Sequence, residues 1–307
     1  MRILVTGGAG FIGSHIVAHF QGRAEVRVLD NLRSGFQRNL AGFKTEFIQA
    51  SILDREAVRR AMAGVDYVFH LAAMISVPES MQQPVECNEL NTTGTLIVLE
   101  EAARAKVKKL VLSSSAAIYG SNPVTPKVEA MAPEPKSPYA ITKLDGEYYC
   151  KMFTDEGRLP TVCLRYFNVF GPRQDPRSQY AAAVPIFIDH AVKNAPIIIH
   201  GDGEQTRDFI YVKDIVVANV FFATQSPASG VFNVAYGRKI TIKQLAQQII
   251  TLTGSRSVIK NQPERPGDVK HSLAAIDKLR AAGFAPASNF DDGLTATIEF
   301  FKSHAKS

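Results

Sequence analysis

Residues 2–13 read RILVTGGAGFIG, and this stretch decides the fold of the chain. The apolar run at 2–6 is typical of a short buried strand, and a helical pattern follows the glycines through Phe20. Gly7, Gly10 and Gly13 have a spacing that allows a tight turn and a close approach of the backbone to a pyrophosphate. The first turn of the helix offers free N–H groups and a positive dipole end to phosphates. The stretch therefore predicts a dinucleotide-binding strand, turn and helix.

A carboxylate ends the second predicted strand, at residues 25–30. Asp30 lies 17 residues past Gly13. A carboxylate at this place accepts hydrogen bonds from the hydroxyls of an adenosine ribose, and it repels a 2′-phosphate. Arg33 close by weakens that preference without reversing it. We therefore predict NAD, rather than NADP, as the cofactor.

Strand-like and helical runs alternate through the first half of the chain. Expected strands cover residues 2–6, 25–30, 45–49, 66–70, 108–113 and 161–166. Expected helices lie near 11–21, 54–63, 85–105 and 138–156. This alternation predicts an α/β fold with a doubly wound, mostly parallel Rossmann sheet. Ligands bind beyond the carboxyl ends of such strands, where we expect residues 70–73, 113–115 and 166–168.

The amino-acid composition of the sequence changes after Asn168. Prolines and glycines are frequent in 171–208, so we expect loops to dominate there. The predicted NAD-binding Rossmann domain covers residues 1–167, and a strand, turn and helix within 209–230 return to it. Residues 168–208 and 231–307 should form a smaller α/β cap domain for the substrate, with a helix near 241–252.

Composition is that of an ordinary globular protein, with 46% hydrophobic and 21% charged residues. The net charge of +6 comes from scattered residues without a basic stripe, so no nucleic-acid partner is predicted.

Three cysteines without motif spacing suit free core thiols in a reducing cytosol. No apolar run reaches transmembrane length and a strand starts at residue 2, so we expect a cytoplasmic protein without membrane segment or signal peptide. No histidine pair has ligand spacing, so no metal site is predicted.

Tyr139 and Lys143 lie four residues apart on a predicted helix, so their side chains share one face. A free tyrosine ionises at about pH 10. A fixed positive charge nearby lowers that pKa, and a shift of about three units needs roughly 4 kcal/mol of differential stabilisation. The lysine and a cationic nicotinamide would supply it in a water-poor cleft. We therefore predict that Tyr139 acts as an acid and a base.

The chain resembles the extended short-chain dehydrogenase/reductase family over essentially its whole length. The motifs that carry the resemblance are TGGAGFIG at 6–13, HLAA at 70–73, SSSAAIYG at 113–120, YAITK at 139–143 and RYFNVFGP at 165–172. GDGEQTRDFIYVKD at 201–214 and PERPGD at 263–268 resemble the nucleotide-sugar branch, in particular the UDP-hexose 4-epimerases that act on UDP-glucose or UDP-N-acetylglucosamine. The resemblance implies inversion at C4 through a transient 4-keto sugar. It also implies a homodimer joined by helices at 85–105 and 138–156.

Residue roles follow from the same resemblance. Tyr139 would exchange the proton of the C4 hydroxyl, Lys143 would hold the nicotinamide ribose, and Ser115 would hydrogen-bond the reacting hydroxyl. The cofactor residues that the resemblance implies are Gly7, Gly10, Phe11, Ile12, Gly13, Asp30, Asn31, Ser34, Gly35, Ser51, Ile52, Leu71, Ala72, Ala73, Asn91, Ser113, Tyr139, Lys143 and Tyr166. Among these, the pair Ser51-Ile52 departs from the acidic and apolar pair that is frequent in the family.

The substrate residues that the resemblance implies are Ser76, Ser114, Ser115, Tyr139, Asn168, Ala182, Val184, His200, Arg207, Arg265, Asp268 and Ser272. Arg207 and Arg265 would bind the diphosphate through forked N–H donors. Asp268 would accept from the ribose of the nucleotide, and His200 would lie against the uracil ring.

Related reactions share the first oxidation and stay open as alternatives. Nucleotide-sugar dehydratases and decarboxylases typically carry an acidic residue just after the serine strand end, where this chain has Ala116 and Ala117. An epimerase is therefore favoured over both. A UDP-uronic acid 4-epimerase remains an alternative, and the intact Ser115, Tyr139 and Lys143 disfavour a non-catalytic NAD-binding regulator.

The size of the predicted sugar pocket bears on the substrate. Ser272 falls where some relatives have a tyrosine that excludes a 2-N-acetyl group, and Ala182 is also small. Ile75 instead argues against a 2-N-acetyl substrate, because relatives that prefer N-acetylated sugars have glycine at this position. We predict turnover of UDP-GlcNAc/UDP-GalNAc and/or UDP-Glc/UDP-Gal. The choice between uridine and thymidine stays open.

Overall fold

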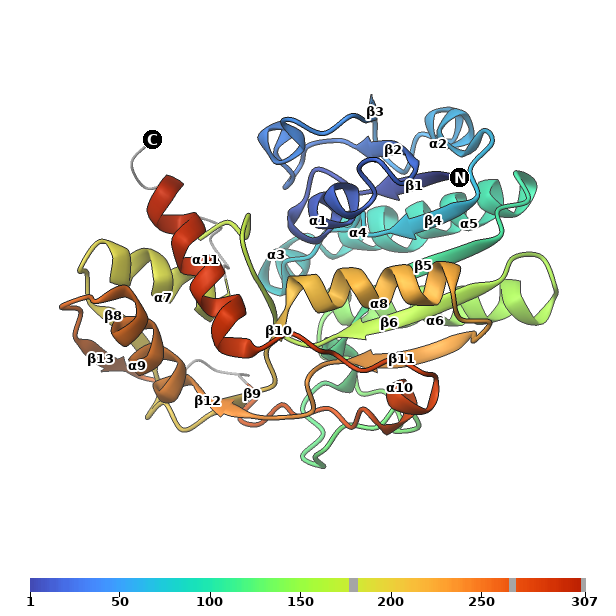
Figure 1. Ribbon diagram of the computed structural model, residues 1–307. Helices are drawn as coiled ribbons and strands as arrows, with labels where there is room; N and C mark the ends of the chain where they lie inside the picture. The colour runs from blue at the N-terminus through green and yellow to red at the C-terminus, as the bar shows by residue number, and fades with distance from the viewer. Residues whose placement is uncertain (177–181, 265–268, 305–307) are drawn as a thin grey trace.

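The structure is a computed structural model that describes residues 1–176, 182–264 and 269–304 (Figure 1). Within these residues the centre is a seven-stranded sheet in the order β11-β6-β5-β4-β1-β2-β3. Its strands are β1 (Arg2–Thr6), β2 (Glu25–Asp30), β3 (Glu46–Gln49), β4 (Tyr67–His70), β5 (Lys109–Ser115), β6 (Thr161–Tyr166) and β11 (Gly230–Val234). Every pairing in this sheet is parallel. The predicted doubly wound Rossmann sheet is confirmed.

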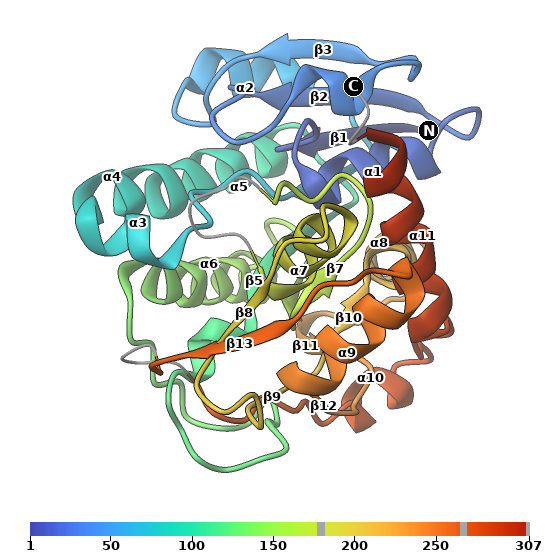
Figure 2. The same ribbon diagram turned by 90° about the vertical axis from the view of Figure 1, so that its left-hand side faces the viewer.

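Helices cover both faces of this sheet, as Figure 2 shows. On one face lie α1 (Phe11–His19) and α8 (Val212–Thr224). On the other lie α2 (Arg55–Met62), α5 (Gly94–Arg104) and α6 (Pro138–Asp155). Two short helices, α3 (Val77–Gln82) and α4 (Pro84–Asn88), follow the loop after β4, and a π-helical turn (Glu89–Thr93) joins α4 to α5. The sheet is thus enclosed, with its strand ends free for a site.

The central strands are apolar on both faces because helices cover both. Ile3 and Val5 of β1 pack in the cluster with α1 and α8, whereas Leu4 packs in the cluster with α2 and α5. All three side chains are fully buried. Alternate residues of a strand point to opposite faces, so a parallel strand between two helix layers reads as a continuous apolar run.

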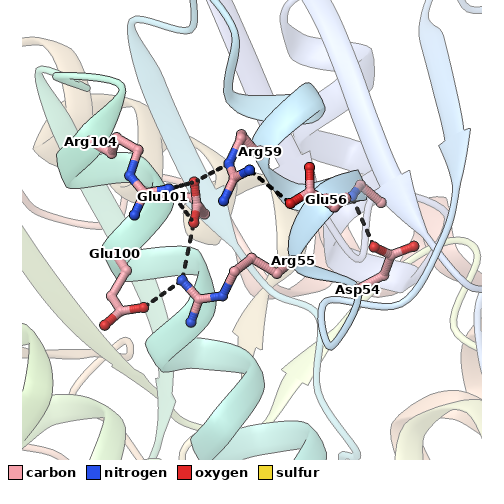
Figure 3. Close-up of polar contacts among 8 residues, drawn as sticks. Asp54, Arg55, Glu56, Arg59, Glu100, Glu101 and Arg104 are labelled. Atoms are coloured by element: carbon pink, nitrogen blue, oxygen red, sulfur yellow. Dashed lines mark hydrogen bonds and ion pairs between the residues drawn. The ribbon is translucent and has the colours of Figure 1, made fainter.

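A buried carboxylate ties α2 to α5 (Figure 3). Glu101 of α5 is only 1% exposed, and it pairs with Arg55 at 3.1 Å, Arg59 at 3.2 Å and Arg104 at 3.3 Å. Asp54 caps α2 by accepting the backbone N–H of Ala57 at 3.0 Å. Three guanidinium groups offset the desolvation of one carboxylate, so this network joins the two helices rather than forming an open site.

A smaller α/β layer lies beside the carboxyl ends of the sheet (Figure 1). Its elements are α7 (Ala183–Val192), β8 (Ile197–His200), α9 (Ile242–Thr253), β13 (Ile259–Gln262) and α11 (Phe290–His304). Strands β8 and β13 pair in parallel, and Ile188, Leu245 and Leu294 share one buried core. Two short pairs link this layer to the sheet: β7 (Val169–Phe170) with β10 (Ile210–Tyr211), and β9 (Thr206–Arg207) with β12 (Ile240–Thr241).

The structure differs from the sequence expectations in three elements. Strand β11 belongs to the main sheet and pairs with β6, although residues from 231 onward were expected in the cap. Helix α10 (Asp277–Ala281) follows it there, because Leu279 is buried in the cluster of the sheet face. Helix α7 occupies a part of 171–208 where loops were expected. Its apolar face is buried in the cap core, which overrides the flanking prolines and glycines.

Helix α8 follows β10 and packs on the sheet face, as expected for 209–230. The three cysteines are free thiols and all are buried. In the described ranges, none of the helices combines the length and apolarity needed to cross a membrane.

Candidate active site

The glycine loop brings three backbone segments together at the end of β1. Gly7 has φ of 70°, and a Cβ atom there would lie 2.7 Å from the backbone nitrogen of Ala72. A Cβ on Gly13 would lie 2.2 Å from the carbonyl oxygen of Gly7. Only glycine fits such contacts. Gly10 is the N-cap of α1 and provides no side-chain cap, so the first N–H groups of α1 face the loop. This cradle fits a pyrophosphate.

Asp30 fixes the next loop against this cradle. Its carboxylate accepts the backbone N–H of Ala9 at 2.9 Å and of Leu32 at 2.7 Å. A Cβ on Gly35 would lie 2.8 Å from the carbonyl carbon of Ala9, so the loop passes in close contact. Burial raises the pKa of Asp30, which the two N–H donors oppose. The carboxylate keeps lone pairs that suit the hydroxyls of a ribose.

A cleft of about 560 Å³ opens at these strand ends. Of the residues predicted to contact cofactor or substrate, it is lined by Gly7, Gly10, Phe11, Ile12, Gly13, Asp30, Asn31, Ser34, Gly35, Ile52, Leu71, Ala72, Ala73, Ser113 and Ala182. The loops after β1, β2, β3 and β4 contribute to the lining, together with Ser113 near the end of β5. Parallel strands end at one edge of the sheet, which is why residues so far apart in sequence share one cleft.

Further lining residues were not among the predicted ones. They are Leu29, Phe36, Asn39, Ala50, Leu90, Arg173, Gln174 and Asp175. Arg173 and Gln174 follow the motif RYFNVFGP, so their place just after a strand-end motif was the signal that could have found them. The Oε1 atom of Gln174 is buried and has no hydrogen-bond partner among the described residues.

Five predicted cofactor residues do not line this cleft: Ser51, Asn91, Tyr139, Lys143 and Tyr166. Asn91 is buried, and its amide clamps the backbone of Met74, accepting its N–H at 2.7 Å and donating to its carbonyl at 3.0 Å. Asn91 therefore positions the loop after β4. The Tyr166 hydroxyl donates to Asn219 of α8 at 2.9 Å. The Ser51 hydroxyl accepts the N–H of Leu53 at 3.2 Å within a turn. Each of these three side chains has a hydrogen bond within the protein, and their contacts with the cofactor stay predictions.

Helix α6 starts so that Tyr139 falls in its first turn. Ser137 is the N-cap and accepts the N–H of Ala140 at 3.2 Å, and Pro138 occupies the first helical position. The N–H of Tyr139 has no partner within the helix, and it donates instead to Ser80 of α3 at 3.2 Å. Helix α3 therefore anchors the start of the helix that carries Tyr139 and Lys143.

Ser115, Tyr139 and Lys143 come together at the end of β5. The Ser115 side chain hydrogen-bonds Tyr139, and its oxygen also accepts the N–H of Ala117 at 3.1 Å. The Lys143 ammonium donates to the carbonyl oxygen of Ser113 at 2.8 Å and lies 5.8 Å from the centre of the Tyr139 ring. The structure thus groups the three residues that were predicted to act together.

Burial dominates the ionisation of this group. It lowers the pKa of Lys143 to about 8. It raises the pKa of Tyr139, and the hydrogen bond from Ser115 opposes that rise only in part. The sequence led us to expect that Lys143 would lower the pKa of Tyr139. The net shift has the opposite direction, because desolvation of the phenolate is its largest cause and the ammonium of Lys143 is directed to the Ser113 carbonyl.

Ser114 lies on the other face of β5. It is 2% exposed and donates to Glu147 of α6 at 2.5 Å. Glu147 also holds Arg165 through two hydrogen bonds of 2.8 and 2.7 Å. Side chains alternate along a strand, so Ser114 cannot share the side of Ser113 and Ser115. This corrects the expectation that Ser114 contacts the substrate.

The remaining predicted substrate residues are spread over the border of the two layers. Ser76 caps α3 by accepting the N–H of Glu79 at 3.1 Å. Asn168 donates to the carbonyl of Asp208 at 2.9 Å. Val184 is fully buried in the cap core, so its side chain does not face the cleft, contrary to expectation. Arg265 and Asp268 lie outside the described residues.

A second cavity of about 240 Å³ lies at the end of β8. Its lining residues are His200, Asp202, Glu204, Gln205, Glu264, Val269, Lys270 and His271. The backbone of Thr206 pairs with both Lys270 and Ser272, at 2.9 and 3.1 Å. This pairing brings Ser272 beside Arg207. Three predicted substrate residues thus come to one region, although 72 positions separate His200 from Ser272.

Asp208 holds this region in place. It is fully buried and accepts the N–H of Tyr236 at 3.1 Å, of Gly237 at 3.0 Å and of Ala274 at 3.2 Å. Burial raises the pKa of Asp208 to about 7, against the pull of these donors. Asp208 therefore positions Arg207 by joining its strand to two distant segments.

The histidine at the end of β4 belongs to the core. His70 contacts Thr6 at 2.7 Å and Thr95 at 2.9 Å through its two ring nitrogens. Burial and the charge of Lys143 lower the pKa of His70 to about 3, so the ring is neutral.

The fold and the cleft together define a dinucleotide-binding protein, and comparison with known proteins agrees. The model of the NAD dependent epimerase/dehydratase family matches residues 3–235. The chain is 42% identical to the UDP-N-acetylglucosamine 4-epimerase from Methanobrevibacter ruminantium M1, solved in complex with UDP-N-acetylmuramic acid, with a TM-score of 0.95 and coverage of 99% of this chain and 98% of that one.

Two further relatives frame the range of reactions. The UDP-glucose 4-epimerase of Thermus thermophilus, solved in complex with NAD, is 36% identical, with a TM-score of 0.90 and coverage of 98% of this chain and 99% of that one. The UDP-N-acetyl-alpha-D-glucosaminuronate decarboxylase of Bacillus cytotoxicus is 32% identical over 319 residues and 98% of each chain. This chain belongs to the NAD-dependent epimerase/dehydratase family, and its cofactor is NAD.

Proposed function

We propose that the chain is a UDP-hexose 4-epimerase that acts on UDP-GlcNAc/UDP-GalNAc and/or UDP-Glc/UDP-Gal. One observation carries the proposal: the hydroxyls of Ser115 and Tyr139 meet beside a buried lysine, and the chain continues from Ser115 into Ala116 and Ala117. This set manages one proton at one hydroxyl. It offers no carboxyl group directly after Ser115 for a second step.

The proton work falls to the chain itself. Tyr139 would take the proton of the C4 hydroxyl and return it later, while Ser115 holds the same oxygen by a hydrogen bond. The ammonium of Lys143 stabilises the phenolate form and would hold the nicotinamide ribose. NAD, when bound, supplies the two-electron acceptor and donor for C4. The 4-keto sugar must rotate between the two halves of the reaction, so that it presents its opposite face. Its diphosphate would keep it bound during the rotation.

The raised pKa of Tyr139 bears on the order of events. In the protein without ligands the phenol is protonated at neutral pH, because burial disfavours the phenolate. A positively charged nicotinamide would add to the charge of Lys143. Ionisation of Tyr139 would then accompany cofactor binding, so that the base forms only where it is used.

The nucleotide diphosphate needs cations at the border of the two layers. Arg207 lies on β9 beside Ser272, and Arg265 was predicted for the same task from its motif. A guanidinium offers paired N–H donors that match phosphate oxygens. Asn168, Ala182 and His200 would complete the contacts to the sugar and the base.

Substrate size is the finer part of the proposal. Ser272 and Ala182 are small and leave room for a 2-N-acetyl group. Ile75 lines the cofactor cleft, and its bulk would narrow the approach to the sugar. We therefore propose that acetylated and plain hexoses are both accepted.

A decarboxylase or dehydratase is the second candidate, because such relatives match nearly the whole chain. Both reactions begin with oxidation at C4 and then need a further acid or base. A UDP-uronic acid 4-epimerase is a third candidate with the same proton chemistry as the proposed enzyme.

One experiment separates these candidates. UDP-GlcNAc, UDP-Glc and UDP-GlcA are incubated separately with the protein and NAD, and the sugars are followed by proton NMR. Inversion at C4 of either UDP-hexose supports the proposal. Loss of the C6 carboxylate as CO2, or loss of water at C5 and C6, would identify one of the rivals. Unchanged sugars in every tube would sink the epimerase.

The matched control is Tyr139→Phe, which keeps the ring and removes the hydroxyl. It should bind NAD as the unchanged protein does and leave every sugar unaltered. A variant that still inverts C4 would exclude Tyr139 as the acid and base.

We also propose that the protein is a homodimer. Exposed apolar side chains gather on three neighbouring helices: Met81 on α3, Val85 on α4, and Ile141 and Tyr148 on α6. Val85 is 70% exposed and Tyr148 is 58% exposed. Large exposed apolar side chains on adjacent elements are typical of a protein interface. Helices α4 and α6 fall in the two stretches expected to join the subunits, 85–105 and 138–156, whereas α3 precedes the first of them.

A further inference from the structure

Two walls of the cofactor cleft are joined by a pair of ion pairs. One wall is the loop after β2, residues 31–36, and the other is the loop after β4, residues 71–75. Between them lies the glycine loop, because β1 is the middle strand of β4-β1-β2. Arg33 reaches from the first wall to the short helices that follow the second wall, and it binds Glu79 of α3 and Glu86 of α4. We call these three residues the clasp.

The geometry of the clasp is specific. Nη2 of Arg33 lies 2.9 Å from Oε1 of Glu79, while Nη1 pairs with Oε1 of Glu86. Each carboxylate therefore takes a separate nitrogen of the guanidinium. The paired hydrogen bonds raise the pKa of Arg33 further, so its charge is permanent. One guanidinium with two carboxylates holds both short helices at once, and Figure 2 shows α3 and α4 side by side.

The backbone around Arg33 is shaped to present it. Asp30 accepts the N–H of Leu32 at 2.7 Å, and Asn31 accepts the N–H of Arg33 at 3.1 Å. Leu32 has φ of 61°, a left-handed conformation that side chains rarely adopt. Two consecutive side-chain turns thus hold the loop in a strained form that directs Arg33 across the cleft.

The opposite end of the clasp is tied to the catalytic helix. Glu79 lies in the first turn of α3, whose N-cap is Ser76. The next residue, Ser80, accepts the N–H of Tyr139 at 3.2 Å. The clasp therefore connects the side of the cleft that suits an adenosine ribose with the start of the helix that carries Tyr139 and Lys143.

We propose that the clasp of Arg33, Glu79 and Glu86 retains the cofactor, so that the dinucleotide leaves only after these ion pairs open. The inference rests on the proposed function, in which one cofactor molecule must stay bound through both halves of a turnover. A dinucleotide across the glycine loop lies under a bridge that joins both walls. Arg33 is committed to two carboxylates, which also leaves it unsuited to a 2′-phosphate.

The size of the effect follows from exposure. All three side chains are partly exposed, and exposed ion pairs are weak and screened by salt. Two pairs on one guanidinium act together, so opening of the clasp should raise the dissociation rate about three- to tenfold. The same rate in the unchanged protein should rise with ionic strength.

The test measures release of the cofactor rather than turnover. The protein is loaded with NADH and mixed with a large excess of NAD, and the decay of protein-bound NADH fluorescence gives the dissociation rate. The variants are Arg33→Gln, the double variant Glu79→Gln/Glu86→Gln, and all three changes combined. The control is Arg38→Gln, which removes an exposed cation that stacks on Phe36 near the end of the same loop.

The clasp predicts faster release for Arg33→Gln and for the double carboxylate variant, with the control unchanged. The combined variant should release NADH no faster than either, because partners of one interaction are not additive. Salt should accelerate release in the unchanged protein and in the control, but not in the variants that lack the clasp.

Other results overturn the clasp. Unchanged rates in both variants, or effects that add fully in the combined variant, exclude it. Tighter binding of NADP by the double carboxylate variant, with unchanged NADH release, would identify Arg33 as a restrained phosphate ligand instead. If Arg33→Gln fails to fold, the double carboxylate variant alone tests the clasp. Neither glutamate is buried, so their replacement should not prevent folding. Failure of the unchanged protein to bind NADH would contradict both the clasp and the proposed function. Failure to invert C4 would contradict the proposed function, because the clasp is tested by NADH release alone.

Discussion

The ammonium of Lys143 lies 5.8 Å from the centre of the Tyr139 ring, and its hydrogen bond goes to the backbone carbonyl of Ser113. Both side chains are carried by α6, one turn apart, and the carbonyl belongs to β5. The strand therefore fixes the distance between the lysine charge and the phenol. A buried ammonium beside a buried phenol costs desolvation free energy, and a bound cofactor and sugar would put that charge to use.

Replacement of Lys143 by methionine should raise stability while abolishing activity. Burial lowers the pKa of Lys143 to about 8, from about 10.5. A lysine whose folded pKa is lowered costs stability wherever it is charged in the folded state. The full cost, of the order of 3 kcal/mol, applies below pH 8 and disappears as the pH rises towards 10.5. The free energy of unfolding, measured with urea, should be higher for Lys143→Met than for the unchanged protein at pH 7. The difference between the two proteins should be smaller at pH 9.5. An equal difference at both values would contradict this burial argument.

Tyr139→Phe should lose C4 inversion by about 10²- to 10⁴-fold, the range expected when a general acid and base is removed. Its stability should change little, since the ring stays and only the hydroxyl contact with Ser115 is lost. The NMR time course gives the rate, and NADH fluorescence gives cofactor binding. Loss of both together would mean that the variant disturbs the cleft rather than the chemistry.

Ser272→Tyr should end turnover of UDP-GlcNAc/UDP-GalNAc and spare UDP-Glc/UDP-Gal. The backbone of Ser272 is held against Thr206, so a larger side chain projects from a fixed point beside Arg207. Rates for the two substrate pairs are compared under equal conditions, with Ser272→Ala as the control that keeps the space open. Equal losses for both pairs would refute the idea of a size gate at this position.

Glu101→Gln should destabilise the protein by about 2 kcal/mol at pH 7, because three arginines lose the carboxylate between them. Burial alone would raise the pKa of Glu101, but the hydrogen bonds of Arg59 and Arg55 hold it below the usual value. A lowered carboxylate pKa stabilises the fold above the unfolded pKa of about 4.3, and the contribution is lost as the pH falls through the folded value. The unfolding temperature of Glu101→Gln should therefore be lower than that of the unchanged protein at pH 7. The difference between the two proteins should be smaller below pH 4. Glu100→Gln, at an exposed position, is the control and should change little.

Val85→Asp combined with Tyr148→Asp should convert the dimer to a monomer. Both side chains are exposed on neighbouring helices, and a buried aspartate in an apolar interface lacks a partner. Light scattering after gel filtration measures the mass. Val258→Asp changes an exposed valine of another face and should leave the mass unchanged. A monomer in the unchanged protein at micromolar concentration would contradict the homodimer.

Much of the site was readable in the sequence because it depends on short-range chemistry. The glycine spacing of 7–13, the carboxylate of Asp30 and the Tyr139/Lys143 spacing each lie within one turn or one strand end. The alternation of β5 was readable too, and it should have placed Ser114 away from Ser113 and Ser115.

Other features escaped sequence analysis because distant partners define them. Strand β11 exists through its pairing with β6, since an edge strand has few local signals of its own. Helix α7 is stabilised by an apolar face buried in the cap core, which local proline and glycine content does not reveal. The role of Asn91 depends on Met74, which lies 17 residues earlier in the chain.

The sequence by itself determined the doubly wound Rossmann fold of the first half, the cofactor cradle and the three residues at the end of β5. Backbone conformation around glycine, and side-chain spacing on one helix, are local and do not need the rest of the molecule. Only the tertiary structure decided that Lys143 binds Ser113, that Ser114 binds Glu147, and that Arg33 bridges to residues 46 and 53 positions further along the chain. Hydrogen bonds and ion pairs require atoms within about 3 Å, and for groups so far apart in sequence only packing of the elements creates that distance.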